Sequence, residues 1–369
     1  MQNNALSAES QERWAAWWEF DMVDRPLLLA GYPAENPEPA RSLPEGRAFP
    51  APLPKPEDPE ELRLYNRWFD IDDHISRNLR NFARRVPALE TTLQLDTGWS
   101  VAYCLPFGVR AEYNERAAWC EPLPGRDCSS GFAYDYGGEW HRWLSEGTRR
   151  MAEAGRGLYY VTPVMWGNHA GDTLSNLVGL DQLMYDCADR PNDVIRALRQ
   201  ITEAQIRVFQ ELREHERLTG LPGTRNYTGT WSPKTGLGFD CDISAMVSPD
   251  MYKSIFLPPL LEIMETVDHR IYHLDGPVCL QHLDTLLSLP QLHAIQWVCG
   301  AGNEGLGRWY DLYRKIQAAG KSIIVYASYD EVPEVCRQLK PEGLAISFEP
   351  PSKEKMLEML EKIEKMYKT

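Results

Sequence analysis

The chain has 369 residues, of which 43% are hydrophobic, enough for a sizeable core in one large domain or two modest ones. Its 39 Lys and Arg residues against 53 Asp and Glu residues give a formal charge of −14, which would repel a phosphate backbone and argues against a nucleic-acid partner. We find no run of about 18 apolar residues that would predict a membrane span, and no basic-then-apolar leader, so we expect a cytoplasmic protein without a membrane partner.

The first 89 residues predict helices on either side of a proline-rich excursion. Residues 7–23 place three tryptophans at helical spacing, which is typical of an amphipathic helix packed against a larger body. Residues 33–59 contain nine prolines, which sustain neither a helix nor a central strand and indicate an extended surface segment. Residues 58–86 carry a broad apolar stripe and predict one long helix.

From residue 90 onward the pattern alternates between strands and helices. Strands are expected at 91–95 and 157–164, and helices at 192–215 and at 249–267, the last with a kink at Pro258-Pro259. The last hundred residues are the most regular. Their expected strands are 270–274, 294–298, 322–327 and 343–348, and the helices that follow them are 278–288, 308–319, 330–339 and 352–368.

Repeated strand–helix units predict an α/β fold with parallel strands and right-handed crossovers. An open doubly wound sheet and a closed barrel both satisfy that pattern. No GxGxxG follows the first strand, which weakens the dinucleotide-binding version of the open sheet. Because eight units fit the length, we predict a (β/α)8 TIM barrel over residues 90–369, with residues 1–89 packed on it as an N-terminal extension.

The eight cysteines are scattered and form no CxxC pair. In a chain of this length without a secretion signal, a disulfide framework is not expected. We therefore predict buried, reduced thiols.

Candidate site residues gather where the expected strands end. In a barrel, reactive groups occupy the carboxyl ends of the strands. In the segment RIYHLDG (270–276), strand alternation points His273 and Asp275 to the same face. We predict catalytic roles for Asp96, Asp242 and His273. The predicted substrate-binding residues are Trp166, His169, Tyr227, Trp231, Trp297 and Tyr326.

Each candidate also has a structural interpretation that the sequence leaves open. Asp96 and Asp242 are residue types that are typical of turns and local caps. His169, in GNHAGD, is typical of a loop, and the aromatic candidates are typical of a core. His273 and Asp275 would also form a structural hydrogen-bonded pair.

His273 and Asp275, together with Glu349 after the last strand, predict a divalent-metal site. Catalytic zinc commonly keeps three protein ligands and one open position. One imidazole with two carboxylates is a harder ligand set than one with thiolates, so iron or manganese is an alternative. Glu349 precedes two prolines and is also typical of an exposed loop acid.

Three stretches resemble the uroporphyrinogen decarboxylase-like superfamily, whose barrels include uroporphyrinogen decarboxylase, corrinoid-dependent methyltransferases and proteins similar to cobalamin-independent methionine synthase. They are DCDISAMVSPDMYKSIFLPPLLEIMETV (240–267), RIYHLDG (270–276) and GLAISFEPPSKEKMLEML (343–360). The resemblance covers roughly residues 90–369 and implies a (β/α)8 barrel.

The methyltransferase branch of that superfamily holds zinc with the histidine and cysteine of an H-x-C motif and a cysteine after the last strand. These positions fall on His273, Asp275 and approximately Glu349, so carboxylates replace both thiolates. The resemblance implies methyl transfer between a small substrate and a thiol or a separate corrinoid protein, with zinc as the implied metal. In the decarboxylase branch an aspartate binds pyrrole nitrogens, and Asp96 resembles it in position. The arginine-rich N-terminal motif of that branch is absent.

Three functions follow from these observations. We expect metal-assisted methyl transfer first, decarboxylation of a small or porphyrin-like carboxylate second, and ligand binding without catalysis third. A homodimer is compatible with each, because symmetric dimers are the commonest oligomers.

Overall fold

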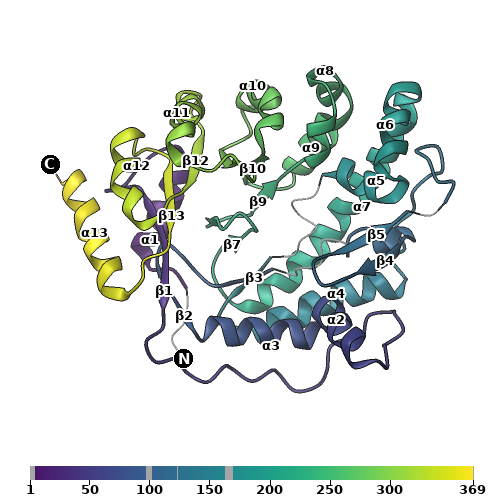
Figure 1. Cartoon of the computed structure of the whole chain (residues 1–369), viewed down its shortest axis with the longest axis horizontal. Coiled ribbons are helices and arrows are strands. Elements are labelled where there is room, and N and C mark those ends of the chain that lie inside the picture. Colours follow the sequence, from purple (N-terminus) through teal and green to yellow (C-terminus); the bar gives the residue numbers. More distant parts are fainter. Residues whose placement is uncertain (1–4, 97–101, 123, 163–168, 369) are drawn as a thin grey trace.

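The computed structural model describes residues 5–96, 102–122, 124–162 and 169–368. The chain forms an α/β structure whose largest sheet has seven strands in the order β2-β1-β13-β12-β11-β10-β9. Every neighbouring pair in this sheet is parallel except β1 with β2. Strands β3 and β6 form a separate parallel pair. Figure 1 shows helices α10 to α13 along the outer edge of the molecule, with strands β9, β10, β12 and β13 inside them.

The strands of these two sheets are β1 (Leu27–Pro33), β2 (Arg85–Leu89), β3 (Gln94–Asp96), β6 (Tyr160–Thr162), β9 (Gly236–Phe239), β10 (His269–Asp275), β11 (Ala294–Val298), β12 (Ser322–Tyr326) and β13 (Leu344–Phe348). Two antiparallel hairpins are formed by β4 (Arg110–Tyr113) with β5 (Ala118–Glu121), and by β7 (Thr224–Arg225) with β8 (Trp231–Ser232). The helices are α1 (Ala8–Trp18), α2 (Pro59–Phe69), α3 (Ile71–Phe82), α4 (Glu139–Ala154), α5 (Ala170–Val178), α6 (Leu180–Asp189), α7 (Pro191–Glu216), α8 (Pro249–Met251), α9 (Leu257–Met264), α10 (Leu283–Leu287), α11 (Tyr310–Ala318), α12 (Val332–Gln338) and α13 (Lys353–Tyr367).

The strand–helix alternation predicted for the last hundred residues is confirmed. Strands β10 to β13 pair in parallel, in sequence order, and a helical segment follows each strand. The strand residues are almost all buried and rich in Ile, Val and Leu, as expected for parallel strands covered on both faces.

The single helix predicted over residues 58–86 is wrong, because the chain breaks at Asp70 and later turns into a strand. Asp70 has an extended backbone, with φ −91° and ψ 106°, and its carboxylate accepts a hydrogen bond from the Asp73 amide. It therefore caps the start of α3 directly after α2 ends. The chain then enters β2, which pairs antiparallel with β1.

The segment after Ser248 shows the predicted irregularity at its two prolines. Ser248 accepts a hydrogen bond from the Met251 amide and caps α8. The residues from Tyr252 to Phe256 form a π-helical turn before α9 begins at Leu257. Proline cannot donate a backbone hydrogen bond, and the wider turn accommodates that loss.

The N-terminal segment joins the central sheet rather than only lying against it. Strand β1 pairs in parallel with β13, with Leu27 opposite Ala345 and Leu29 opposite Ser347. No strand is predicted here from the sequence. The proline-rich stretch beyond β1 contains no helix or strand, as predicted, and Ala51 within it is buried.

Helix α1 carries a tryptophan plug, defined as Trp14, Trp17 and Trp18, all buried. Ser7 caps the helix, and the three indoles contact one another edge to face. The plug packs in one cluster with side chains from β1, β6 and β10 to β13. The predicted packing role of these tryptophans is confirmed.

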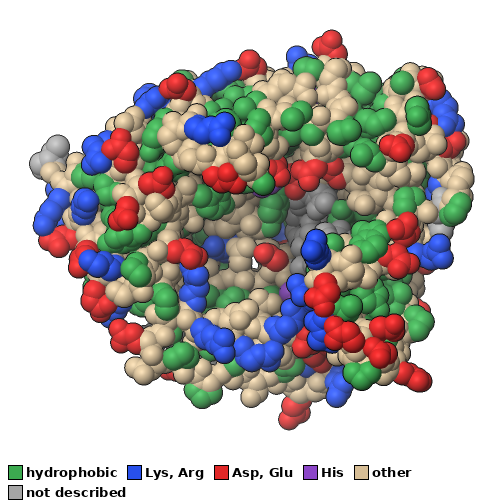
Figure 2. All heavy atoms as spheres, in the orientation of Figure 1, with side chains coloured by type: hydrophobic (Ala, Val, Ile, Leu, Met, Phe, Trp, Pro, Cys, Tyr) green, Lys and Arg blue, Asp and Glu red, His purple; other side chains and the backbone are tan. Residues whose placement is uncertain are grey.

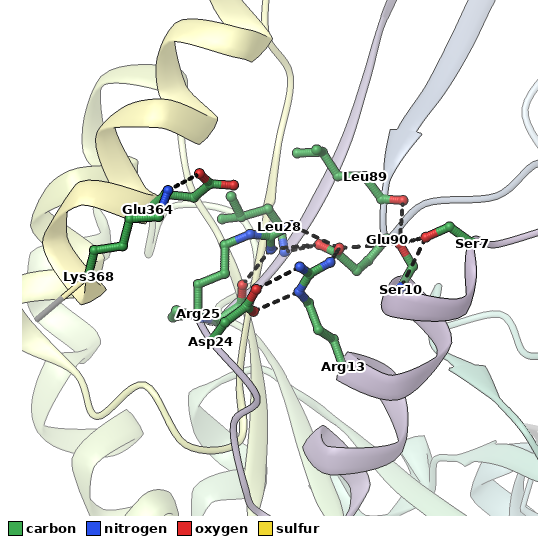
Figure 3. Close-up of polar contacts among 11 residues, drawn as sticks. Ser7, Ser10, Arg13, Asp24, Arg25, Leu28, Leu89, Glu90, Glu364 and Lys368 are labelled. Atoms are coloured by element: carbon green, nitrogen blue, oxygen red, sulfur yellow. Dashed lines mark hydrogen bonds and ion pairs between the residues drawn. The ribbon is translucent and has the colours of Figure 1, made fainter.

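A buried ion pair fixes the plug to the sheet (Figure 3). The Glu90 carboxylate is fully buried and accepts hydrogen bonds at 2.9 and 3.0 Å from the Arg25 guanidinium. It also accepts hydrogen bonds from Arg13 and from the Leu28 amide. This charge is therefore matched on every side, which is the condition for a buried ion to be tolerated.

All eight cysteines are free thiols, and seven of them are buried, as predicted. Among the described residues, no helix is long and apolar enough to cross a membrane.

Candidate functional site

The contacts of the strand side chains distinguish an inner and an outer face of the sheet. The inner cluster with the tryptophan plug contains Ile271, Ala294, Ile324 and Ala345. The core beneath the helices contains the residues next to them in sequence, Tyr272, Ile295, Val325 and Ile346. Because side chains alternate along a strand, His273, Gln296 and Tyr326 lie on the inner face, nearer the carboxyl ends.

A chain of hydrogen bonds connects side chains on three neighbouring strands, β10, β11 and β12. His273 on β10 lies opposite Gln296 on β11, and its Nδ1 is 2.6 Å from Gln296 Oε1. Gln296 in turn donates from Nε2 to the Tyr326 hydroxyl on β12 and to the Thr228 carbonyl. An amide oxygen only accepts, so Nδ1 of His273 carries the proton. No described residue forms a hydrogen bond with Nε2 of His273.

Asp96 and Arg225 form the second part of the site. Asp96 ends β3 and accepts hydrogen bonds from Thr162 on β6 and from Gln94. Burial raises the pKa of Asp96, and the Arg225 charge nearby opposes that rise. Arg225 donates to Gln94 and to Thr92, which are both neutral. Burial lowers the pKa of Arg225 to about 10, so it remains a cation at neutral pH.

Tyr227 connects the inner face of β9 and β10 to a buried carboxyl group. Its hydroxyl donates to Asp240 Oδ2 at 3.0 Å, and its ring lies 6.0 Å from the His273 ring. Glycine at position 238 makes room for it, since a Cβ there would come within 2.8 Å of the Tyr227 ring. Burial, followed by the Asp240 charge, raises the pKa of Tyr227 well above its ordinary value.

Three aspartates crowd one another beside this tyrosine. Asp172, in the first turn of α5, accepts hydrogen bonds from the Asp242 and Ile243 amides at 3.1 and 2.7 Å. Burial and then the Asp242 charge raise the pKa of Asp172 to about 7. Burial, Asp172 and Asp242 raise the pKa of Asp240 well above its ordinary value. Close carboxylates cannot all ionise, so the group holds protons at neutral pH.

We call this assembly the strand-end site. It comprises Asp96, Asp172, Arg225, Tyr227, Asp240, Asp242, His273, Gln296 and Tyr326. Figure 2 shows the molecule hollowed near its centre, with acidic and basic side chains around the hollow. A fixed cation and proton-bearing carboxyl groups therefore share one region of the inner face.

The predicted metal ligands are not assembled in this structure. Glu349 is highly exposed and follows β13, which lies three strands from β10 in the sheet, and it pairs with Arg85 on β2 at 2.7 Å. Asp275 is exposed at the end of β10, and no hydrogen bond is recorded between it and His273, whose Nδ1 is held by Gln296. The three residues therefore do not fit a metal, and zinc remains a prediction from the resemblance.

Among the described residues, one group of three does bring ligand atoms within 4.8 Å: His169, Asp172 and Cys241. The ligand atoms of His169 and Asp172 already form other hydrogen bonds. His169 accepts from the Gly171 amide through Nδ1 and donates to the Phe256 carbonyl through Nε2. Asp172 accepts two amides, and burial raises the pKa of Cys241 well above its ordinary value, which disfavours the thiolate.

Several predicted substrate-binding residues occupy structural positions instead. Trp297 belongs to the outer core, where it meets Trp309 edge to face at 4.9 Å. Trp231 packs in the plug cluster and donates to the Tyr160 hydroxyl at 3.1 Å. His169 is the buried N-cap of α5. Trp166 lies outside the described residues.

Asp172 and Arg225 are not among the site residues predicted from the sequence. Arg225 is the only cation in a glycine-rich stretch between residues 218 and 233, and that isolation was the available signal. Asp172 lies three residues after His169 in GNHAGD, in the first turn of a helix rather than at a strand end.

No family model matches the chain, and no curated protein matches it. Among solved structures, macrophomate synthase is similar over 59% of this chain and 78% of its own, at 9% identity and a TM-score of 0.20. A likeness at that score carries no argument about fold or function.

Proposed function

We propose that this chain is an enzyme that removes carbon dioxide from a small organic acid at the strand-end site. The observation that carries this proposal is the pairing of a desolvated cation, Arg225, with carboxyl groups that hold protons at neutral pH. Decarboxylation needs both: a cation to bind the acid and a proton for the carbon that loses it.

The proposal includes a (β/α)8 barrel made of β1, β3, β6 and β9 to β13. The shared cluster of α1 with residues from β1, β6 and β10 to β13 supports closure around one interior. The parallel β3–β6 pair would fill the arc between β1 and β9. In such a barrel the strand-end site lies at the face where reactive groups gather.

In the proposed reaction, the substrate carboxylate lies toward Arg225 and its carbon skeleton toward Tyr227 and His273. The bond between the carboxyl carbon and the skeleton breaks, carbon dioxide leaves, and the electron pair stays on the skeleton. A proton from the Asp240–Asp172–Asp242 group then bonds to that carbon. Substrates that stabilise the electron pair, such as β-keto acids and aromatic or pyrrole carboxylates, are the expected class.

Decarboxylation is favoured over metal-assisted methyl transfer because His273, Asp275 and Glu349 do not meet. The resemblance to the uroporphyrinogen decarboxylase-like superfamily is compatible with both activities, since one of its branches decarboxylates and another transfers methyl groups. A corrinoid protein as partner remains a prediction from that resemblance.

The test is release of carbon dioxide from a panel of β-keto, hydroxybenzoic and pyrrole carboxylic acids. We expect Asp240→Asn and His273→Ala to lower kcat/KM at least 100-fold, about 3 kcal/mol of transition-state stabilisation. Glu349→Gln, on the exposed ion pair, is the matched control and should keep full activity. Activity of the parent protein should fall as the pH rises above about 7, because the carboxyl group then loses its proton.

Turnover that survives Asp240→Asn, or that rises with pH through 7 to 9, would contradict the proposed acid. Tight binding of an acid from the panel without release of carbon dioxide would instead support a ligand-binding protein.

A further inference from the structure

A cavity of about 440 Å³ lies between the C-terminal end of α7 and the segment around β7, and none of the strand-end carboxylates lines it. We call it the rear cavity. Its lining includes Arg213 and Glu216 from α7, Arg225 from β7, and Lys234. Its volume is in the range of small-molecule pockets.

The rear cavity is cationic in a chain of net charge −14. Arg213, Arg217, Arg225 and Lys234 line it, against two acidic residues, Glu216 and Asp268. Arg217 is paired with Glu214 at 2.7 Å outside the cavity lining. The other three cations have no carboxylate within 4.0 Å among the described residues.

Arg213 is the clearest case of a cation in the rear cavity that lacks a direct partner. Its Nε is buried and has no hydrogen-bond partner in the described part of the chain. Burial lowers the pKa of Arg213. The charges of Glu216, Asp268 and Glu214 act on Arg213 from beyond ion-pair distance and offset this burial only in part. A bound anion would supply a direct partner.

Glu216 does not neutralise these cations at neutral pH. Burial raises the pKa of Glu216 to about 8, even though Arg213 and Arg217 oppose the rise. The group is therefore mostly protonated at pH 7 and offers a hydroxyl donor rather than a negative charge.

The rear cavity and the strand-end site share Arg225. No strand pairing joins β6 to β9 among the described residues. A separate, much narrower pocket of about 10 Å³ lies in this region, lined by Thr162 and Tyr227 as well as Arg213 and Arg225. Thr162 and Tyr227 hold Asp96 and Asp240, so Arg225 borders both spaces.

We propose that the rear cavity binds a small organic anion, a carboxylate or phosphate on a body of a few carbon atoms. Guanidinium groups match the oxygen pairs of both anions, and Lys234 adds a mobile point charge at the exposed edge. This anion site shares Arg225 with the proposed substrate site, but Arg213, Arg217 and Lys234 belong to the rear cavity, and the anion binding does not depend on the reaction proposed above.

The test is titration of the full chain with inorganic phosphate and, separately, with malonate, at constant ionic strength set with sodium chloride. Calorimetry should show saturable binding of at least one probe. Arg213→Gln should weaken that binding at least tenfold, and Lys234→Gln severalfold. Arg213→Lys should retain part of it. Arg314→Gln, which removes an exposed arginine paired with Asp311 on α11, is the matched control and should bind as the parent does.

Three results would overturn the proposal. They are binding that does not saturate, binding that both Arg213→Gln and Lys234→Gln leave unchanged, and binding that His273→Ala abolishes. The last would place the anion at the strand-end site. Lys234 is exposed, so Lys234→Gln should fold. This variant therefore tests the proposal even if Arg213→Gln does not fold.

Discussion

Buried carboxyl groups have different partners at the two ends of the inner face. At the plug end, the Glu90 carboxylate accepts hydrogen bonds from Arg13, Arg25 and the Leu28 amide. At the strand-end site, Asp240 has Tyr227 as its side-chain donor and two further carboxyl groups beside it. At the plug end, cations and an amide neutralise the buried carboxylate, which stabilises the fold. At the strand-end site, protons and a cation stay available for a ligand.

Burial alone therefore does not identify a functional charge. Glu90 is the most buried acid of the two regions, but its partners account for it fully. The candidate site is recognised by carboxyl groups whose pKa values are raised by burial and by neighbouring carboxylates. The predictions that follow test this contrast, from the largest expected effect to the smallest.

Glu90→Ala should lower the free energy of unfolding by about 3–5 kcal/mol, because it leaves Arg25 buried without its counter-charge. Urea denaturation followed by tryptophan fluorescence would measure the loss. Asp240→Asn should destabilise far less, since it removes a crowded carboxyl group. Equal losses in the free energy of unfolding would contradict the proposed difference between the two ends.

Glu216→Gln should stabilise the protein at alkaline pH. The folded-state pKa of about 8 lies above the ordinary value of 4.5, so the folded chain holds an extra proton between these values. The parent should therefore lose stability as the pH rises from about 4.5 to 8. Above pH 8 the variant should be more stable by about 1–2 kcal/mol, which allows for partial exposure.

Denaturation of both proteins across pH 4 to 9, in phosphate-free buffer, measures this difference. The two curves should meet near pH 4, where the carboxyl group is protonated in both states. A constant offset at every pH would show that the substitution changes packing rather than charge.

Glu349→Gln should have the smallest effect. Its ion pair with Arg85 is exposed, and exposed pairs contribute about 0–1 kcal/mol. Thermal unfolding should shift by no more than a degree or two, and metal content should equal that of the parent. Loss of a bound divalent ion in this variant would restore the metal site predicted from the sequence.

The fold was predictable where local pattern and tertiary packing agree. Strands β10 to β13 combine apolar runs with regular helices and were found close to their observed bounds. Strand β1 was missed because LLLAGYP is short and lies beside a proline-rich stretch. The break at Asp70 was missed because an apolar stripe continues on both sides of a residue that caps the next helix.

The site was predictable only where a residue's strand position fixes its direction. His273 and Tyr326 follow from alternation along β10 and β12, and Asp96 from the end of β3. Alternation along β11 also excludes Trp297 from the site, because its neighbour Gln296 points inward. Arg225 and Asp172 were not predictable, because a hairpin and a helix start bring them to the site without any periodic signal.

The most direct test of the account is a pH titration of aspartate carboxyl carbons by carbon-13 NMR, with Asp172→Asn and Asp240→Asn spectra to assign the signals. We predict that the signal lost in Asp172→Asn titrates near pH 7 in the parent, and that the signal lost in Asp240→Asn titrates well above its ordinary range. If both signals titrate below pH 5, the carboxyl groups are ionised at neutral pH, and the strand-end site cannot supply the proton that the proposed reaction needs.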